Sequence, residues 1–201
     1  MEILNMENQD LDLDIIDYAI SVLSEGGVII YPTDTIYGLG VSIFDKDAVK
    51  KVYQIKGRDE NKPISACFPS IKSVLMLTKG NNQDINILNR NLPGPFTFIM
   101  YKKRGLGFKF FDKDNPKIGI RIPKSEIAIE LSKIFPITAT SANKSLMETL
   151  STPKEIVKQL NHDVDLAIDI GPLKSDKFST VVDLTKLKPT ILREGSGNLI
   201  I

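Results

Sequence analysis

Short apolar runs alternate with amphipathic helical segments along nearly the whole chain, and this alternation limits the possible folds more than any other feature. Apolar residues recur at helical spacing between 13 and 25, and Gly26-Gly27 ends that segment. The run 28–31 is short and apolar, and Pro32 closes it, as expected of a buried strand. Interleaved signals of this kind predict one α/β domain, in which a twisted sheet of mixed parallel and antiparallel strands is flanked by helices.

Residues suited to N-capping predict where later helices begin, namely Asp45, Ser70, Ser125 and Thr152, and a further helix is expected at about 82–91. Strands are expected at 41–44, 64–68, 96–101, 117–122, 137–141, 165–170, 180–184 and 190–193. Gly38-Leu39-Gly40 is expected to be a loop whose glycines let the backbone approach a bound group. No repeat or linker divides the chain, so residues 1–201 are predicted to form a single domain.

Composition excludes a disordered protein, a collagen-like fibre and a membrane protein. Hydrophobic residues make up 42% and charged residues 25% of the sequence, which is typical of a globular protein in water. The longest clean apolar run is far too short to cross a bilayer, and the acidic first 26 residues, without Lys or Arg, do not resemble a secretory signal. The single cysteine, Cys67, has no partner for an internal disulfide. We therefore expect a cytoplasmic protein with no membrane association.

The usual catalytic groups are scarce. His162 is the one histidine of the sequence, and its polar surroundings predict a solvated surface residue. One His and one Cys exclude the common zinc sites and histidine-centred triads. There is no P-loop, and Gly38-Leu39-Gly40 lacks the third glycine of a dinucleotide fingerprint. We predict no metal site built by the protein itself.

The net charge of +1 hides an uneven distribution. The first 26 residues carry seven carboxylates and contribute −7, so the remaining residues contribute +8. A basic body favours an anionic ligand, although scattered solvated lysines would give the same total.

Polar residues gather where the expected strands end. These groups are 33–35, Lys56 with Arg58 and Lys62, Arg121, 138–143, Ser179-Thr180, and Arg193. Each group alone has a structural explanation, such as turn hydrogen bonds or the helix dipole. Together they supply cations and hydroxyls without bases or nucleophiles. Such a site suits a reaction whose substrates already carry the charge and the nucleophile, as in nucleotidyl transfer from ATP.

Seven segments in order resemble the YrdC family, whose best-known members are the threonylcarbamoyl-AMP synthases. They are 31–40, Lys56-Gly57-Arg58 with Lys62-Pro63, 93–97, 119–123, Ser141-Ala142-Asn143, 179–184 and Leu192-Arg193, and the likeness runs from about 13 to 195. The resemblance implies a nucleotidyltransferase that converts L-threonine, bicarbonate and ATP to L-threonylcarbamoyl-AMP and pyrophosphate. The product is the precursor for modifying adenosine 37 of tRNA, so downstream threonylcarbamoyl-transfer proteins are implied partners.

The resemblance also implies residue roles. For the nucleotide these are Lys56 and Arg58 as catalytic residues on the phosphates, together with Lys62, Ser141, Asn143, Thr149 and Arg193. For threonine they are Thr35, Cys67, Arg121 and Ser179, with Arg121 on the carboxylate as its planar fork suits. Mg²⁺ is expected on the ATP phosphates.

The chain departs from the family pattern at a few positions. Cys67 stands where some members have His, and Leu146 stands where the family often has Gly, so the later hydroxyl on the nucleotide is either Thr149 or Ser151. Two other functions remain open on the residues alone. One is a module that binds double-stranded RNA or tRNA without catalysis. The other is a carbamoyl-transfer enzyme that uses a different amine or carbamoyl phosphate.

Overall fold

The computed structural model describes residues 1–6, 11–103, 115–161, 163–173 and 178–201, so His162 lies outside the described residues. The strands are β1 (Glu2–Asn5), β2 (Ile29–Tyr31), β3 (Gly38–Gly40), β4 (Ser65–Cys67), β5 (Thr78–Lys79), β6 (Phe96–Lys102), β7 (Lys117–Arg121), β8 (Ile137–Ser141), β9 (Leu166–Asp169), β10 (Thr180–Asp183) and β11 (Thr190–Arg193). The helices are α1 (Leu13–Ser24), α2 (Lys46–Lys56), α3 (Ile71–Leu77), α4 (Asn82–Asn91), α5 (Glu126–Leu131) and α6 (Pro153–Gln159). None of the helices within those ranges is long and apolar enough to cross a membrane.

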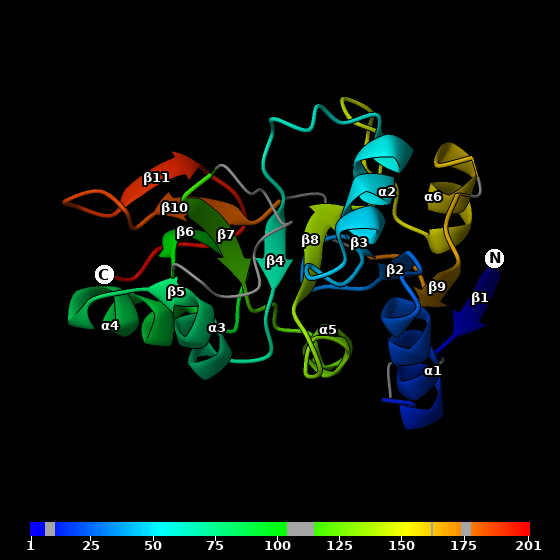
Figure 1. Cartoon of the computed structure of the whole chain (residues 1–201), viewed down its shortest axis with the longest axis horizontal. Coiled ribbons are helices and arrows are strands. Elements are labelled where there is room, and N and C mark those ends of the chain that lie inside the picture. Colours follow the sequence, from blue (N-terminus) through cyan, green and yellow to red (C-terminus); the bar gives the residue numbers. More distant parts are fainter. Residues whose placement is uncertain (7–10, 104–114, 162, 174–177) are drawn as a thin grey trace.

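All of these strands belong to one sheet of order β1-β9-β2-β3-β8-β4-β7-β6-β10-β11, with β5 beside β6 (Figure 1). β9 runs parallel to β1 and β2, β4 to β7, and β6 to β10, while the other pairs are antiparallel. The predicted α/β class with a mixed sheet is therefore confirmed. Because β8 lies between β3 and β4, segments far apart in the sequence are neighbours in the middle of the sheet.

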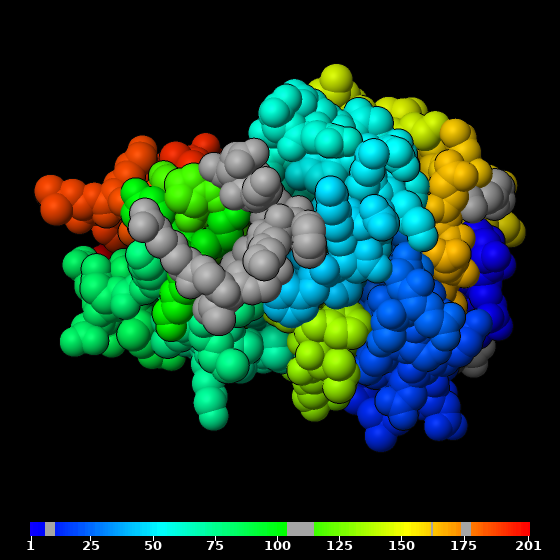
Figure 2. Space-filling view, in the orientation of Figure 1, coloured from blue at the N-terminus to red at the C-terminus, as the bar shows by residue number. Residues whose placement is uncertain are grey.

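Helices cover both faces of the sheet. In Figure 1, α2 and α6 lie above the strands and α1 and α5 lie below them. One core cluster packs α1 and α5 against inward side chains of the strands, among them Tyr31 and Cys67. The larger cluster includes the apolar faces of α2 and α6. At one end of the molecule the turn between β10 and β11 projects away from the body, with Leu187 fully exposed (Figure 2).

The largest difference from the sequence prediction lies after β2. Gly38–Gly40 forms strand β3 and not a loop, whereas 41–44 contributes only an isolated bridge from Ser42. A Cβ at Gly38 would lie 2.8 Å from Cζ of Tyr31, and one at Gly40 would lie 2.9 Å from its Cε1. These glycines therefore make room for the buried Tyr31 ring, a packing demand that the pattern of residues did not reveal. Strands β1 and β5 were also not predicted.

The helix signals that position the site are confirmed. The Asp45 side chain accepts hydrogen bonds from the first turn of α2. Gly57 ends α2 in the left-handed conformation, at φ 57°, which favours glycine. The chain turns there, so Arg58 leaves the axis of the helix and enters the segment before β4.

Candidate functional site

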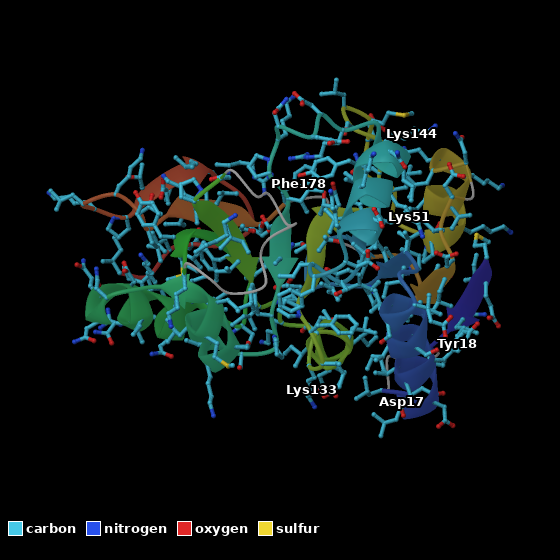
Figure 3. The ribbon with its side chains drawn as sticks, viewed as in Figure 1. Asp17, Tyr18, Lys51, Lys133, Lys144 and Phe178 are labelled. Atoms are coloured by element: carbon cyan, nitrogen blue, oxygen red, sulfur yellow. The ribbon has the colours of Figure 1, made fainter. Side chains whose placement is uncertain are left out.

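A cavity of about 470 Å³ lies over the middle of the sheet. Its walls include Arg58, Cys67, Arg121, Ser141, Ser179 and Arg193, six of the residues predicted from the sequence. They come from the segment after α2, from the ends of β4, β7, β8 and β11, and from the residue before β10. Phe178, which is labelled in Figure 3, also lines the cavity. Groups that are more than 100 residues apart in the sequence therefore share one hollow.

Arg121 is held by two neighbours that follow β2. Its Nη2 donates to Oδ1 of Asp34 at 2.5 Å and to Oγ1 of Thr35 at 2.8 Å. The Arg121 and Asp34 side chains are only 11% and 10% exposed, so water screens the ion pair weakly. Arg121 Nε and Asp34 Oδ2 are buried and have no hydrogen-bond partner among the described residues. The guanidinium is thus fixed at the cavity wall by one edge.

Ser179 and Arg193 form a second polar group on the wall. Arg193 Nη2 donates to the main-chain oxygen of Ser179 at 2.8 Å, and the Ser179 hydroxyl lies 2.8 Å from that of Thr97. The Arg193 guanidinium also lies over the Phe178 ring, 5.2 Å from its centroid. Burial, and then the charge of Arg121, lower the pKa of Arg193. Two guanidinium groups on the lining of one cavity favour an anionic ligand there.

Arg58 stabilises the turn before β4 through two hydrogen bonds. Its Nε donates to the main-chain oxygen of Lys62 at 3.1 Å, and its Nη2 donates to that of Pro63 at 3.0 Å. The Lys62 side chain is exposed and does not line the cavity. Arg58 therefore brings the positive charge of this segment to the cavity itself.

Lys56 and Asn143 are buried beneath the residues that line the cavity. The Lys56 ammonium donates to the main-chain oxygens of Ser141 and Asn143, and neither Lys56 nor Asn143 lines the cavity. Burial, and then the charge of Arg58, lower the pKa of Lys56 to about 7. Direct contact of Lys56 with the ATP phosphates stays a prediction.

The lining offers electrostatic binding more than acid–base chemistry. Burial raises the pKa of the Cys67 thiol to about 12, so this group is neutral at physiological pH and is a poor nucleophile. Cys67 is instead the partner of Arg121 in the parallel pairing of β4 with β7. Within the described residues, no group of three or more His, Cys, Asp or Glu side chains could hold a metal ion.

Comparison with known proteins identifies the family. The model of the Sua5/YciO/YrdC family, described as "Telomere recombination", matches residues 21–195. The chain belongs to the Sua5/YciO/YrdC family. A Methanocaldococcus jannaschii family member, provisionally named a threonylcarbamoyl-AMP synthase, is 38% identical over 94% of this chain and 89% of its own length.

Two solved structures of the Sua5/YciO/YrdC family are close to this fold. Pyrococcus abyssi Sua5 complexed with L-threonine matches with a TM-score of 0.88 and 28% identity, over 96% of this chain and 57% of its own. Escherichia coli YciO matches with a TM-score of 0.89 and 30% identity, over 98% of this chain and 96% of its own. This chain therefore spans just over half of the Sua5 chain and nearly all of YciO.

The remaining predicted residues lie at different depths around the cavity. Thr35 is buried behind Arg121. In the segment before α6, Thr149 is partly buried and Ser151 is exposed, and neither lines the cavity. The sequence analysis placed Asp34 in the polar group 33–35 but gave it no role at the site, where it accepts a hydrogen bond from Arg121. It also missed the ion pair of Lys117 with Asp183, 3.4 Å apart on the wall. Asp183 belongs to segment 179–184, which resembles the family, and this resemblance was the one sequence signal that could have indicated a role for Asp183.

Proposed function

We propose that this protein is a nucleotidyltransferase that forms L-threonylcarbamoyl-AMP and pyrophosphate from L-threonine, bicarbonate and ATP. The observation that carries the proposal is the convergence of Arg58, Arg121 and Arg193 on one cavity of about 470 Å³. A cavity of this size is in the usual range for sites that enclose small ligands. The L-threonine complex of Sua5, a structural neighbour in the same family, supports an amino acid as one occupant.

Threonine would occupy the part of the cavity near Arg121. The Arg121 guanidinium, with one edge held by Asp34 and Thr35, would bind the α-carboxylate. Ser179 and Cys67 line the same cavity and would contact the rest of the amino acid, although the Cys67 thiol is buried and lies 3.8 Å from the main-chain oxygen of Ala128. Thr35 would act from behind Arg121 or directly on the ligand once the site is filled.

The nucleotide would lie against Arg58, Ser141 and Arg193. Lys62 is exposed at the edge of this region and would reach the phosphates as a flexible cation. Asn143 and either Thr149 or Ser151 would shape the same side from the segment after β8. Mg²⁺ would arrive on the ATP phosphates, as that ion usually does.

The reaction needs no protein nucleophile. Bicarbonate takes up a proton and gives carbon dioxide and water, and the neutral amine of threonine adds to the carbon dioxide and releases a proton, so that a carbamate forms. A carbamate oxygen then attacks the α-phosphorus of ATP. The bond from that phosphorus to the β-phosphate oxygen breaks, and pyrophosphate leaves. Because attacking group and ATP are both anions, the main task of Arg58, Arg121 and Arg193 is to offset repulsion and to orient the two.

The product would serve the modification of adenosine 37 in tRNA, in the cytoplasm, through proteins that transfer the threonylcarbamoyl group. Direct binding of double-stranded RNA or tRNA is the alternative function. A backbone-binding surface would require no enclosed cavity, whereas small neutral groups such as Ser141 and Ser179 line this one.

The test is release of pyrophosphate by the purified protein, with the product identified by mass. We expect release only when L-threonine, bicarbonate and ATP are all present, and we expect Arg58→Ala to lose most of it while remaining folded. Release without threonine would indicate a different amine or carbamoyl donor. No release, together with tRNA binding that weakens steeply with salt, would instead support the RNA-binding module.

A further inference from the structure

Lys56 differs from the cavity-lining cations because every donor of its ammonium group already has a protein oxygen as its acceptor. The residue is only 2% exposed. Its Nζ donates to the main-chain oxygen of Ser141, to that of Asn143 at 2.7 Å, and to Oδ1 of Asn143 at 3.4 Å. A lysine ammonium has three N–H donors, so these three acceptors use all of them. In this arrangement no donor is left for a phosphate.

The Asn143 side chain extends the network. Its Oδ1 accepts from Lys56 and, at 2.5 Å, from the hydroxyl of Ser141. Its Nδ2 donates to the main-chain oxygens of Lys144 at 3.0 Å and Met147 at 2.6 Å. The primary amide therefore makes four hydrogen bonds, all within the protein. The ammonium of Lys56 is thus connected to the whole segment 141–147.

Main-chain hydrogen bonds also hold segment 141–147, one of them at the end of α2. The amide of Ser145 donates to the main-chain oxygen of Lys56 at 2.8 Å, and the amide of Ala142 donates to that of Tyr37 at 2.9 Å. Lys144, in the same segment, lies beside the upper end of α2 in Figure 3. The last residue of α2 is therefore bonded to segment 141–147 by both its side chain and its backbone. Ser141, the first residue of this segment, and Arg58, which follows the end of α2, both line the cavity.

We propose that Lys56 is a positioning residue, which anchors segment 141–147 to the end of α2 and thereby fixes Ser141 relative to Arg58. Without the ammonium, the main-chain oxygens of Ser141 and Asn143 and one acceptor site of the Asn143 amide lose a charged donor. The segment then opens locally, and Ser141 is no longer held beside Arg58. The effect on catalysis rests on the proposed function, whereas the effect on the segment does not.

The test measures amide hydrogen exchange of the ligand-free protein at residues 142–147, at pH 6, where Lys56 is mostly protonated because this pH lies below its lowered pKa of about 7. The variant is Lys56→Met, whose unbranched side chain is one atom shorter and carries no donors. The matched control is Lys51→Met, because Lys51 lies on the same helix and its ammonium donates to the main-chain oxygen of Gly26 at 3.1 Å, away from the cavity. Pyrophosphate release is measured on the same samples, with kcat and the KM for ATP separated.

We expect exchange at 142–147 to be about tenfold or more faster in Lys56→Met, because hydrogen bonds to charged groups contribute enough for such a factor. The Lys51→Met control should match the unmodified protein in that segment. We also expect kcat to fall more than the KM for ATP rises, since Arg58 and Arg193 still meet the phosphates.

Unchanged exchange at 142–147 in Lys56→Met, with a higher KM for ATP, would overturn the proposal and make Lys56 a direct ligand. If Lys56→Met loses protection in every strand, the same comparison is made with Lys56→Gln, which keeps two N–H donors and is expected to show a smaller acceleration. If the unmodified protein releases no pyrophosphate, the proposed function fails while exchange at 142–147 still decides the role of Lys56.

Discussion

Asp34 and Arg121 show how much of the site depends on a single buried pair. Both side chains are about nine-tenths buried, and the Asp34 carboxylate is the one acidic group bonded to Arg121 among the described residues. Removing one partner of a buried ion pair leaves the other charge without compensation, which costs far more than the pair itself contributes. Asp34 therefore has a stability role that is separable from the binding role proposed for Arg121.

This separation predicts a non-additive pair of substitutions. Arg121→Met leaves Asp34 buried and unpaired, so the free energy of unfolding should fall by about 3–5 kcal/mol. Adding Asp34→Asn removes the orphaned charge and should recover part of that loss. Urea unfolding of the two single variants, the double variant and the unmodified protein measures the coupling. A double variant less stable than Arg121→Met alone would contradict this account of the pair.

The residue types of the site were predictable from the sequence, but their tasks were only partly so. Arg58 stands out as a cation just after a helix, and Arg121, Ser141, Ser179 and Arg193 stand out as cations and hydroxyls at the ends of expected strands. That Lys56 and Asn143 bond to the protein itself could not be predicted, because their acceptors are mainly backbone oxygens brought near by the tertiary fold. Sequence patterns describe side chains and say little about backbone acceptors.

At the scale of elements, the hairpin of β2 and β3 supports the floor of the cavity. Tyr31 and Gly38 both line the cavity, and Gly38 and Gly40 pack against the Tyr31 ring. The Tyr31 hydroxyl donates to the main-chain oxygen of Thr138 in β8 at 2.9 Å. The ring thus connects three neighbouring strands, and the absence of side chains at Gly38 and Gly40 makes room for it.

We expect Gly40→Ala to destabilise the protein by about 1–3 kcal/mol, the usual cost of overpacking a core. Its methyl group would lie 2.9 Å from Cε1 of Tyr31, whose ring is buried and whose hydroxyl is held by the main-chain oxygen of Thr138. Gly80→Ala is the matched control, because its methyl group would meet the flexible end of Met100 at 2.9 Å. Urea midpoints measure both effects. Equal midpoints for the two variants would show that the Tyr31 ring does not require Gly40.

Element boundaries were predictable wherever capping and periodicity agreed. The helix expected at 82–91 is α4, Asn82–Asn91, and the strand expected at 190–193 is β11. The segment 38–44 was misassigned because glycine normally disfavours strands, and only the packing of Tyr31 explains its presence in β3. β5, with two residues, is too short to leave a pattern.

At the scale of the whole molecule, the order of strands makes the cavity. β4 pairs with β7 in parallel and with β8 in antiparallel orientation, so strands from three distant segments meet at the centre of the sheet. This order was not predictable from the sequence, because local patterns identify strands without specifying their long-range partners. The resemblance to the family was the only sequence-level guide to it, and the structure confirms the family's fold.

The central claim is that one cavity holds threonine and ATP together, and a crystal structure with L-threonine and a non-hydrolysable ATP analogue tests it most directly. We predict the threonine carboxylate on Arg121, the phosphates against Arg58 and Arg193, and both ligands inside the same hollow. Either ligand bound on a separate surface, with Arg121 still paired only to Asp34 and Thr35, would contradict the account.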